Sequence, residues 1–345
     1  MSRVFTDGFA HYSDILRKWA SYYAPANVPT PGTSAQRRTG TSSMTGGATS
    51  SAWNYLTSNV LAGLTDRAFV GAAALVPVGA SSSVAITLMS GSTEQVTAKW
   101  DGATGKLSVL RGGVNGTQLA ITSAAVGEFG IWNYLEFGSV IHDTAGTTEV
   151  RFNGAVVSEL TLTSQDTKPG AAAGVDAIRL QWNSPATVAW TDVLVDDTAF
   201  QGDIVIDTIF PSGVGTHADF TPNPAGDNYA NVDETRADGD GTYNASSDQG
   251  DMDTFAMGNL TAMPTSEILC VSVNLDLRKD DAATRQVKAV IRQGTTDYLH
   301  ATAMAPAGTF KIHQRLFDTS PDDSLAWEEA DVNNAEVGYE QSLVS

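Results

Sequence analysis

The sequence predicts an all-β protein built from two β-sandwich domains of the jelly-roll type, with one or two short helices. Three observations carry this prediction. Short segments of alternating apolar and polar residues recur along the chain, turn dipeptides containing glycine separate many of them, and few segments have helical spacing. A chain of 345 residues is long enough for two domains that each bury a core.

The N-terminal part of the first domain predicts one strand, one short helix and a long loop. Val4–Tyr12 reads as a short strand, and Asp14–Ala20 as a short helix that Ser13 caps. Residues 24–51 are rich in proline, glycine, serine and threonine, which favours a loop with one strand near Thr39–Met44. We expect Arg37 and Arg38 in this loop to be solvated.

Strands then follow at close spacing, with glycine turns between them and no intervening helices, which indicates a sandwich rather than a parallel α/β sheet. The expected strands are Arg67–Val78, Ser82–Ser90, Glu94–Asp101, Lys106–Arg111, Thr117–Thr122, Trp132–His142, Thr147–Asn153, Val156–Thr163, Val175–Trp182 and Val188–Asp196.

The stretch WNYLEFGSVIHDTAGTTEVRFNG is the clearest of these signals. Apolar residues stand at alternate positions on both sides of a polar turn, as in a half-buried hairpin. Asn153-Gly154 then supplies the positive φ angles of a second tight turn.

The second half, from residue 203 to 345, predicts a smaller sandwich. Gln201–Asp203 forms the expected boundary, so the first domain covers residues 1–200. A strand over Ile204–Phe210 opens the second domain, and a long polar loop follows at 216–255, whose aromatic residues we expect to pack on the domain. The remaining expected elements are strands at Glu267–Leu277, Thr284–Gln293, Thr296–Met304 and Thr309–Asp318, a short helix within Leu325–Ala335, and a closing strand at Val337–Val344 that pairs with Ile204–Phe210.

Two resemblances refine this picture. The W-x-Y-L-E-F hairpin, with its F-N-G turn, resembles concanavalin-A-like jelly rolls of the laminin-G and glucanase type. This implies that the first and last strands of the domain pair, Phe5–Tyr12 beside Ala189–Val195. Over the whole chain, the segments DGFAHY, WTDVLVDD-TAFQGDIVIDTIFPSGVGTHADFTP and DTSPDDSLAWEEADVNNAEVGYE resemble structural proteins of the tailed-bacteriophage virion. That family implies a non-enzymatic tail or capsid component, often oligomeric.

Composition excludes several function classes. The net charge of −19, from 39 acidic and 20 basic residues, argues against a nucleic-acid partner, which requires a basic surface. No apolar run approaches a membrane span and no signal peptide is evident, so we expect a soluble protein, made in the host cytoplasm and assembled into a virion. The single cysteine, Cys270, lies in an apolar run and predicts a core residue rather than a disulfide.

Catalytic patterns are weak. Glucanases on this fold place carboxylates as E-x-D-x-x-E, because retaining hydrolysis needs two carboxyl groups about 5 Å apart. Only the segment from Glu329 to Asn334 comes close, and its last position is an amide. The five histidines are scattered, and no serine-hydrolase, zinc-protease or P-loop motif occurs. We therefore expect no enzymatic activity.

Calcium is the one metal that the sequence suggests, because Ca²⁺ prefers clustered carboxylate and carbonyl oxygens. A solvated acidic loop is the alternative, and we favour it. The candidate ligands are Asp233, Asp238, Asp240, Asp251 and Asp253, with Glu234 and Asp248 beside them, and a weaker cluster is Asp192, Asp196 and Asp197.

Sugar binding by the first domain is the other candidate function, since aromatic rings stack on sugar faces. The candidates are Trp53, Tyr55, Trp100 and Trp182. Strand alternation places most of them equally well in the core, and we favour the core.

The sequence therefore predicts a structural component of a phage particle, tail- or capsid-attached, that contacts further copies of itself, as a trimer, and other virion proteins. The alternative is a receptor-binding tail fibre or adhesin that recognises a host surface glycan, or, less favoured, a glycan hydrolase.

Overall fold

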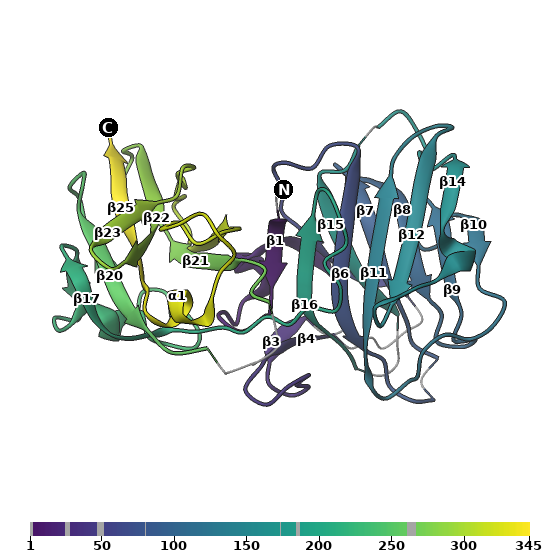
Figure 1. Ribbon diagram of the computed structural model, residues 1–345, viewed down its shortest axis with the longest axis horizontal. Coiled ribbons are helices and arrows are strands. Elements are labelled where there is room, and N and C mark those ends of the chain that lie inside the picture. Colours follow the sequence, from purple (N-terminus) through teal and green to yellow (C-terminus); the bar gives the residue numbers. More distant parts are fainter. Residues whose placement is uncertain are drawn as a thin grey trace. The chain divides into compact units, whose positions relative to one another are not determined.

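The computed structural model describes residues 3–24, 28–46, 52–79, 81–172, 174–183, 187–260 and 267–345. The chain forms two compact units, and the predicted all-β sandwich class is confirmed (Figure 1). Unit 1 comprises Met1–Ala10 and Asp14–Ile206, and unit 2 comprises His11–Ser13 and Asp207–Ser345. The division between Ile206 and Asp207 lies close to the boundary that the sequence indicated.

One layer of unit 1 is a nine-stranded antiparallel sheet. Its main path runs β13-β12-β11-β6-β16-β4-β3, β1 pairs with β16, and β14 pairs with β12. The strands are β1 (Arg3–Asp7), β3 (Thr30–Gly32), β4 (Ser43–Gly46), β6 (Arg67–Leu75), β11 (Trp132–Val140), β12 (Gly146–Phe152), β13 (Ala155–Val156), β14 (Leu162–Gln165) and β16 (Val188–Asp196).

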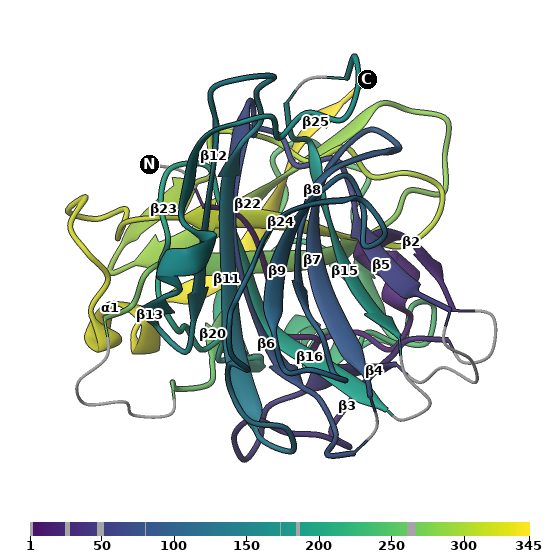
Figure 2. The same cartoon turned by 90° about the vertical axis from the view of Figure 1, so that its right-hand side faces the viewer.

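The other layer is a seven-stranded antiparallel sheet in the order β10-β9-β8-β7-β15-β5-β2 (Figure 2). Its strands are β2 (Trp19–Tyr23), β5 (Asn54–Ser58), β7 (Ser83–Ser90), β8 (Thr93–Trp100), β9 (Leu107–Arg111), β10 (Thr117–Ile121) and β15 (Ala177–Asn183). β2 and β5 were not foreseen, because each is short and one borders a polar loop.

The core of unit 1 lies between the two sheets. Trp182 of β15 packs its ring against the backbone of Gly46 on β4, where an added Cβ would come within 2.5 Å of the ring. Trp100 of β8 meets Phe152 of β12 edge-on, with ring centroids 5.1 Å apart. These contacts identify the inner face of each sheet, and alternation places the neighbouring residues of each strand on the outer face.

The predicted hairpin is confirmed. β11 pairs with β12 in a register that sets Leu135 opposite Phe152, and Asn153 and Gly154 turn with φ angles of 51° and 79°. The prediction of one continuous strand over Val156–Thr163 is wrong. A 3-10 turn, η2 (Ser158–Leu160), divides this segment into β13 and β14.

The first and last strands of unit 1 pair as predicted. β1 lies antiparallel to β16, with Phe5 opposite Val195 and Asp7 opposite Val193. The expected helix over Asp14–Ala20 is only one 3-10 turn, η1 (Ile15–Arg17), capped by Asp14 rather than Ser13. It ends early because the buried Trp19 already belongs to β2.

The expected strand over Ile204–Phe210 is wrong. Its backbone bonds to side chains of unit 1 instead of to a sheet: Asp192 accepts from the Ile206 N–H at 2.9 Å, and the Ile204 carbonyl accepts from Arg37 at 2.8 Å. Arg37 is consequently largely buried, not solvated as predicted. The first strand of unit 2 is instead β17 (Pro211–Ala218).

Unit 2 contains a five-stranded sheet in the order β17-β20-β25-β22-β23, with two further two-stranded sheets, β18-β19 and β21-β24. The closing strand β25 pairs with β20 and β22, not with residues 204–210 as predicted. The elements are β18 (Thr221–Asn223), η3 (Asn228–Asn231), β19 (Tyr243–Ala245), β20 (Met252–Met257), β21 (Val271–Leu277), β22 (Arg285–Gln293), β23 (Thr296–Leu299), β24 (Lys311–Phe317), α1 (Glu329–Asn333) and β25 (Glu336–Val344).

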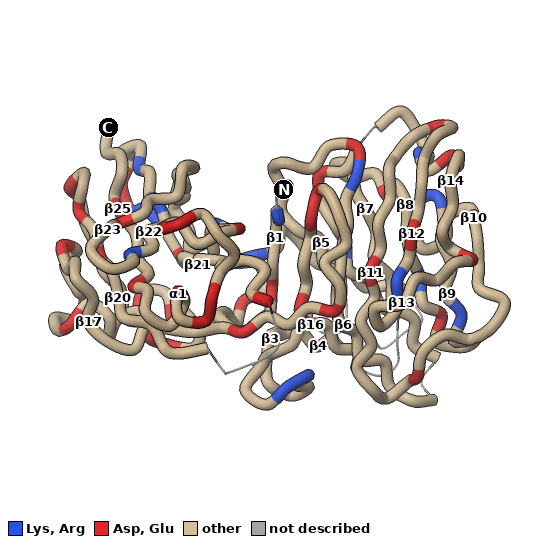
Figure 3. The backbone as a smooth tube through the Cα atoms, in the orientation of Figure 1, with Lys and Arg blue, Asp and Glu red and all other residues tan. Residues whose placement is uncertain are grey.

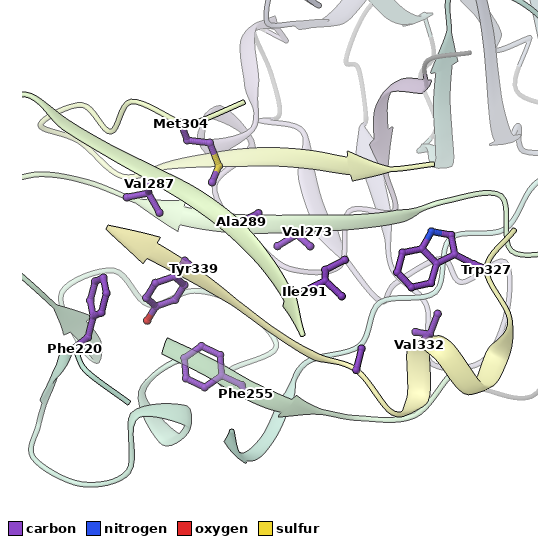
Figure 4. Packing of buried hydrophobic residues seen from close by; sticks show 11 residues of the cluster. Phe220, Phe255, Val273, Val287, Ala289, Ile291, Met304, Trp327, Val332 and Tyr339 are labelled. Carbon is purple, nitrogen blue, oxygen red and sulfur yellow. The ribbon is translucent and has the colours of Figure 1, made fainter. Parts of the chain in front are cut away.

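The core of unit 2 gathers residues from across this unit (Figure 4). Tyr339 of β25 lies between Phe220 and Phe255, with ring centroids 4.9 Å and 5.8 Å away. The prediction that aromatic residues of the 216–255 segment pack on the domain is therefore confirmed, although this segment also holds strands. Cys270, which was predicted to be a core residue, lies just before β21 and is only half-buried.

Aspartate and glutamate residues are spread along the backbone of both units (Figure 3). None of the helices in the described part of the chain is long and apolar enough to cross a membrane.

Candidate functional site

Two of the four predicted sugar-stacking residues lie in the core of unit 1. Trp100 is 1% exposed and Trp182 is 0% exposed. The Trp100 indole N–H donates to the carbonyls of Gly105 and Val126 at 3.1 Å and 2.9 Å. A sugar ring cannot reach either tryptophan, so these two assignments are wrong; alternation on β8 and β15 turns both side chains inward.

Tyr55 is the predicted residue that the structure leaves on an open face. It belongs to β5, opposite Gln181 of β15 and Tyr23 of β2, on the outer face of the seven-stranded sheet. The rings of Tyr23 and Tyr55 stack with centroids 5.7 Å apart and an interplanar angle of 23°. Tyr23 is 48% exposed. Trp53, just before β5, is half-buried.

An arginine on the neighbouring strand β15 packs on one tyrosine of this pair. The Arg179 guanidinium lies over Tyr55, with Cζ 4.0 Å from the ring centroid. Its Nε donates to the Thr57 hydroxyl at 3.0 Å, and its NH1 donates to Oε1 of Glu94 at 2.9 Å. The packing and both hydrogen bonds fix the plane of the guanidinium, which lowers the conformational entropy that a ligand contact would cost.

Polar residues of β15, β7 and β8 form further hydrogen bonds around Arg179 and Glu94. The Gln181 amide donates to Oε1 of Glu94 at 3.1 Å, and its own oxygen accepts from the Thr87 hydroxyl at 2.7 Å. The Thr97 hydroxyl donates to the Gly112 carbonyl at 2.7 Å, which ties the network to the loop after β9. Thr87, Thr97 and Gln181 are buried. We call the set Tyr23, Tyr55, Thr57, Thr87, Glu94, Thr97, Arg179 and Gln181 the outer-face network.

The outer-face network leaves two polar atoms for a ligand. Among the described residues, NH2 of Arg179 and Oε2 of Glu94 have no protein hydrogen-bond partner, and neither atom is buried. The side chains of Arg179 and Glu94 are 16% and 31% exposed. Ring faces beside a fixed donor and a fixed acceptor suit a ligand with both apolar and hydroxyl surfaces.

The aspartates proposed as calcium ligands serve separate structural roles. Asp253 is fully buried and accepts from the Phe220 N–H at 3.0 Å, the Asn228 amide at 2.8 Å and the Tyr339 hydroxyl at 3.2 Å. Asp251 accepts from the Ser246 hydroxyl at 2.6 Å.

The other predicted ligands in this loop also face separate partners. Asp240 pairs with Arg278 at 2.6 Å, and Asp238 accepts from the Thr242 N–H at 3.1 Å. Among the described residues, Asp233 shares no hydrogen-bond or ion-pair partner with them. Across the described ranges, no group of three or more His, Cys, Asp or Glu side chains is placed to hold a metal ion.

The weaker acidic cluster, at the end of β16, is also occupied by protein donors. Asp192 bonds Arg37 and the Ile206 N–H, and burial raises the pKa of Asp192, an effect that both bonds oppose. Asp196 accepts the Thr198 and Ala199 N–H groups at 2.7 Å and 3.0 Å. These carboxylates hold the segment that leaves unit 1.

Sequence reasoning missed the polar half of the outer-face network. Arg179 and Gln181 alternate with the core residues Ile178, Leu180 and Trp182 in a strand that was predicted, so alternation could have placed both on the outer face. Glu94 carries no such signal, because its partner Arg179 lies 85 positions away.

Comparisons with known proteins give only distant structural likenesses. Neither a protein-family model nor a curated protein sequence matches the chain. A galectin from Caenorhabditis elegans, LEC-6, is 15% identical, with a TM-score of 0.29 over 40% of this chain and 88% of that one. Alginate lyase vAL-1 from a Chlorella virus is 12% identical, with a TM-score of 0.37 over 56% and 99%. The carbohydrate-binding module CBM66 from Bacillus subtilis is 8% identical, with a TM-score of 0.34 over 48% and 90%. At these scores function has to be inferred from the residues of the site.

Proposed function

We propose that unit 1 binds carbohydrate on the outer face of its seven-stranded sheet, without chemical conversion of the ligand. The observation that carries this proposal is the outer-face network itself. The exposed Tyr23 stacks on the half-buried Tyr55, beside a charged donor and a charged acceptor that further hydrogen bonds hold in place.

Sugars present two kinds of surface, and the network offers a partner for each. The C–H faces of a pyranose pack on aromatic rings, while its hydroxyl groups donate and accept hydrogen bonds in fixed directions. Binding rather than catalysis is proposed because Oε1 of Glu94 accepts from both Arg179 and Gln181, so this carboxylate acts as a hydrogen-bond acceptor that positions its neighbours.

The test is binding of the full chain to a printed glycan panel, followed by calorimetry with the best ligand. We expect Tyr55→Ala and Arg179→Ala each to weaken binding by about tenfold or more, since each removes a contact worth roughly 1–2 kcal/mol. Thermal unfolding of each variant verifies that the fold persists.

Two substitutions serve as matched controls. Arg67→Ala removes an arginine that, like its ion-pair partner Asp66, is exposed. Tyr298→Ala removes a tyrosine of unit 2 whose hydroxyl donates to Asp322. Both are expected to leave binding unchanged. Folded protein that binds no glycan, or binding unaffected by both site variants, would refute the proposal.

A second candidate function rests on the sequence resemblance to tailed-phage virion proteins. We propose that the chain is a tail- or capsid-attached component that contacts other copies of itself, as a trimer, and other virion proteins. This role is compatible with sugar binding, since a particle-attached protein can also recognise a host surface. Light scattering that gives a monomer, together with failure of the protein to associate with purified particles, would contradict it.

A further inference from the structure

The contacts of Arg179 and Glu94 point to a specific class of sugar. An arginine and a carboxylate can form two parallel hydrogen bonds. Here they form one, between NH1 and Oε1. Each group therefore keeps its second polar atom available, and the two free atoms belong to groups already locked together.

The free atoms have opposite hydrogen-bonding character. NH2 of Arg179 only donates, and Oε2 of an ionised Glu94 only accepts. A hydroxyl group does both, so two neighbouring hydroxyls of one sugar match the pair: one accepts from NH2, and the other donates to Oε2. A carboxylate or sulfate matches NH2 but meets repulsion at Oε2.

From this geometry, and on the basis that unit 1 binds carbohydrate as proposed above, we infer that the ligand is a neutral sugar bound through a vicinal diol, not a uronate, sialylated or sulfated glycan. The charges of the site and of the whole chain also favour a neutral ligand. Arg179 is already neutralised by Glu94, and a chain of net charge −19 repels an anionic polymer at long range.

Gly113 keeps the acceptor open. A Cβ at this position would lie 1.9 Å from Oε2 of Glu94 and 2.5 Å from its Cδ. The φ angle of Gly113 is not in the left-handed region, so alanine is compatible with the backbone. A methyl group there would displace a carboxylate that Arg179 and Gln181 hold. The structure thereby assigns Gly113 a specificity role that its loop position alone does not reveal.

Three variants test the inference on a panel with equal numbers of neutral and anionic oligosaccharides. Wild-type protein is expected to bind neutral members. Glu94→Gln keeps the size of the side chain but removes the charge, so neutral binding should fall about tenfold and binding of anionic members should rise, because Arg179 is then unneutralised. Gly113→Ala should weaken neutral binding by a similar factor. Gly32→Ala is the matched control, since its added Cβ meets nothing within 4 Å.

Each outcome separates this inference from the proposed function. Preferential binding of anionic glycans by wild-type protein, through Tyr55 and Arg179, would overturn the inference and leave carbohydrate binding intact. Neutral binding that Glu94→Gln and Gly113→Ala leave unchanged would overturn it as well. Absence of binding to every member would overturn the proposed function and, with it, the inference.

Discussion

At the scale of single residues, buried carboxylates hold each unit together. Asp253 receives three donors in the core of unit 2, two of them on Oδ2. Burial raises the pKa of Asp253, and the hydrogen bonds from Asn228, Phe220 and Tyr339 act against that rise. A buried group of this kind stabilises only while each of its partners is present.

Replacing Asp253 with asparagine is expected to destabilise unit 2 by about 2–4 kcal/mol. Whichever way the amide is turned, its NH2 group faces at least one donor that Asp253 now accepts. Urea unfolding followed by tryptophan fluorescence measures the change. Asp240→Asn, which removes a surface ion pair with Arg278, should change stability by less than about 1 kcal/mol. Equal effects of the two substitutions would contradict this assignment.

Glu136 links the stability of unit 1 to pH. Its side chain is 2% exposed, Oε1 accepts from the Gly202 N–H at 2.8 Å, and Oε2 has no partner among the described residues. Burial raises the pKa of Glu136 above the ordinary 4.5, although the Gly202 bond opposes this. The folded state therefore binds the proton more tightly than the unfolded chain, so this contribution to stability is full below the unfolded pKa and is lost as pH rises through the folded pKa.

Glu136→Gln removes the titrating group and should flatten the pH dependence of unfolding above pH 4.5. Denaturant midpoints at intervals between pH 4 and pH 8 provide the measurement. Glu128→Gln, at an exposed position, should leave the profile as in the wild type. An unchanged profile in Glu136→Gln would show that Glu136 has the same pKa in the folded and unfolded chains.

At the scale of elements, the β12–β13 hairpin depends on the backbone conformation of the tight turn after β12. Gly154 has a φ of 79° and an added Cβ there meets nothing within 4 Å. Gly154→Ala therefore adds backbone strain without a clash, and should lower the free energy of unfolding of unit 1 by about 1 kcal/mol. Gly32→Ala, free of both strain and clash, is the control for chemical denaturation. A Gly154→Ala protein as stable as the control would contradict this role.

Local patterns predicted elements well where local forces determine them. The β11–β12 hairpin follows from alternation on both sides of a polar turn, and Asn153-Gly154 marks the next tight turn, between β12 and β13. The bounds of β11 and β12 were found within a few residues. Residues 204–210 are equally apolar, yet they form no strand, because Arg37 and Asp192 bind their backbone. In the same way, Tyr55 was predicted as a site residue from its type, whereas Glu94 joins the site only through a contact distant in sequence. The sequence does not display such contacts.

At the scale of the whole molecule, chain length and the break after β16 led us to expect two domains, and the chain divides into two units between Ile206 and Asp207, with His11–Ser13 grouped in unit 2. The sequence did not predict which aromatic side chains are buried. Aromatic residues of similar appearance fall in the core, as do Trp100 and Trp182, or on an outer face, as does Tyr55. Strand register decides between the two, and a shift of one residue would exchange the faces.

The position of β16 has a consequence for how the protein is made. This strand is the last of unit 1 in the chain, but it lies inside the nine-stranded sheet, between β6 and β4, and also pairs with β1. A nascent chain on the ribosome must therefore hold β1, β4 and β6 without their shared neighbour until residue 196 has emerged. Their open edges are exposed to wrong pairing during that interval, so unit 1 can complete its sheet only after nearly all of its own sequence has been translated.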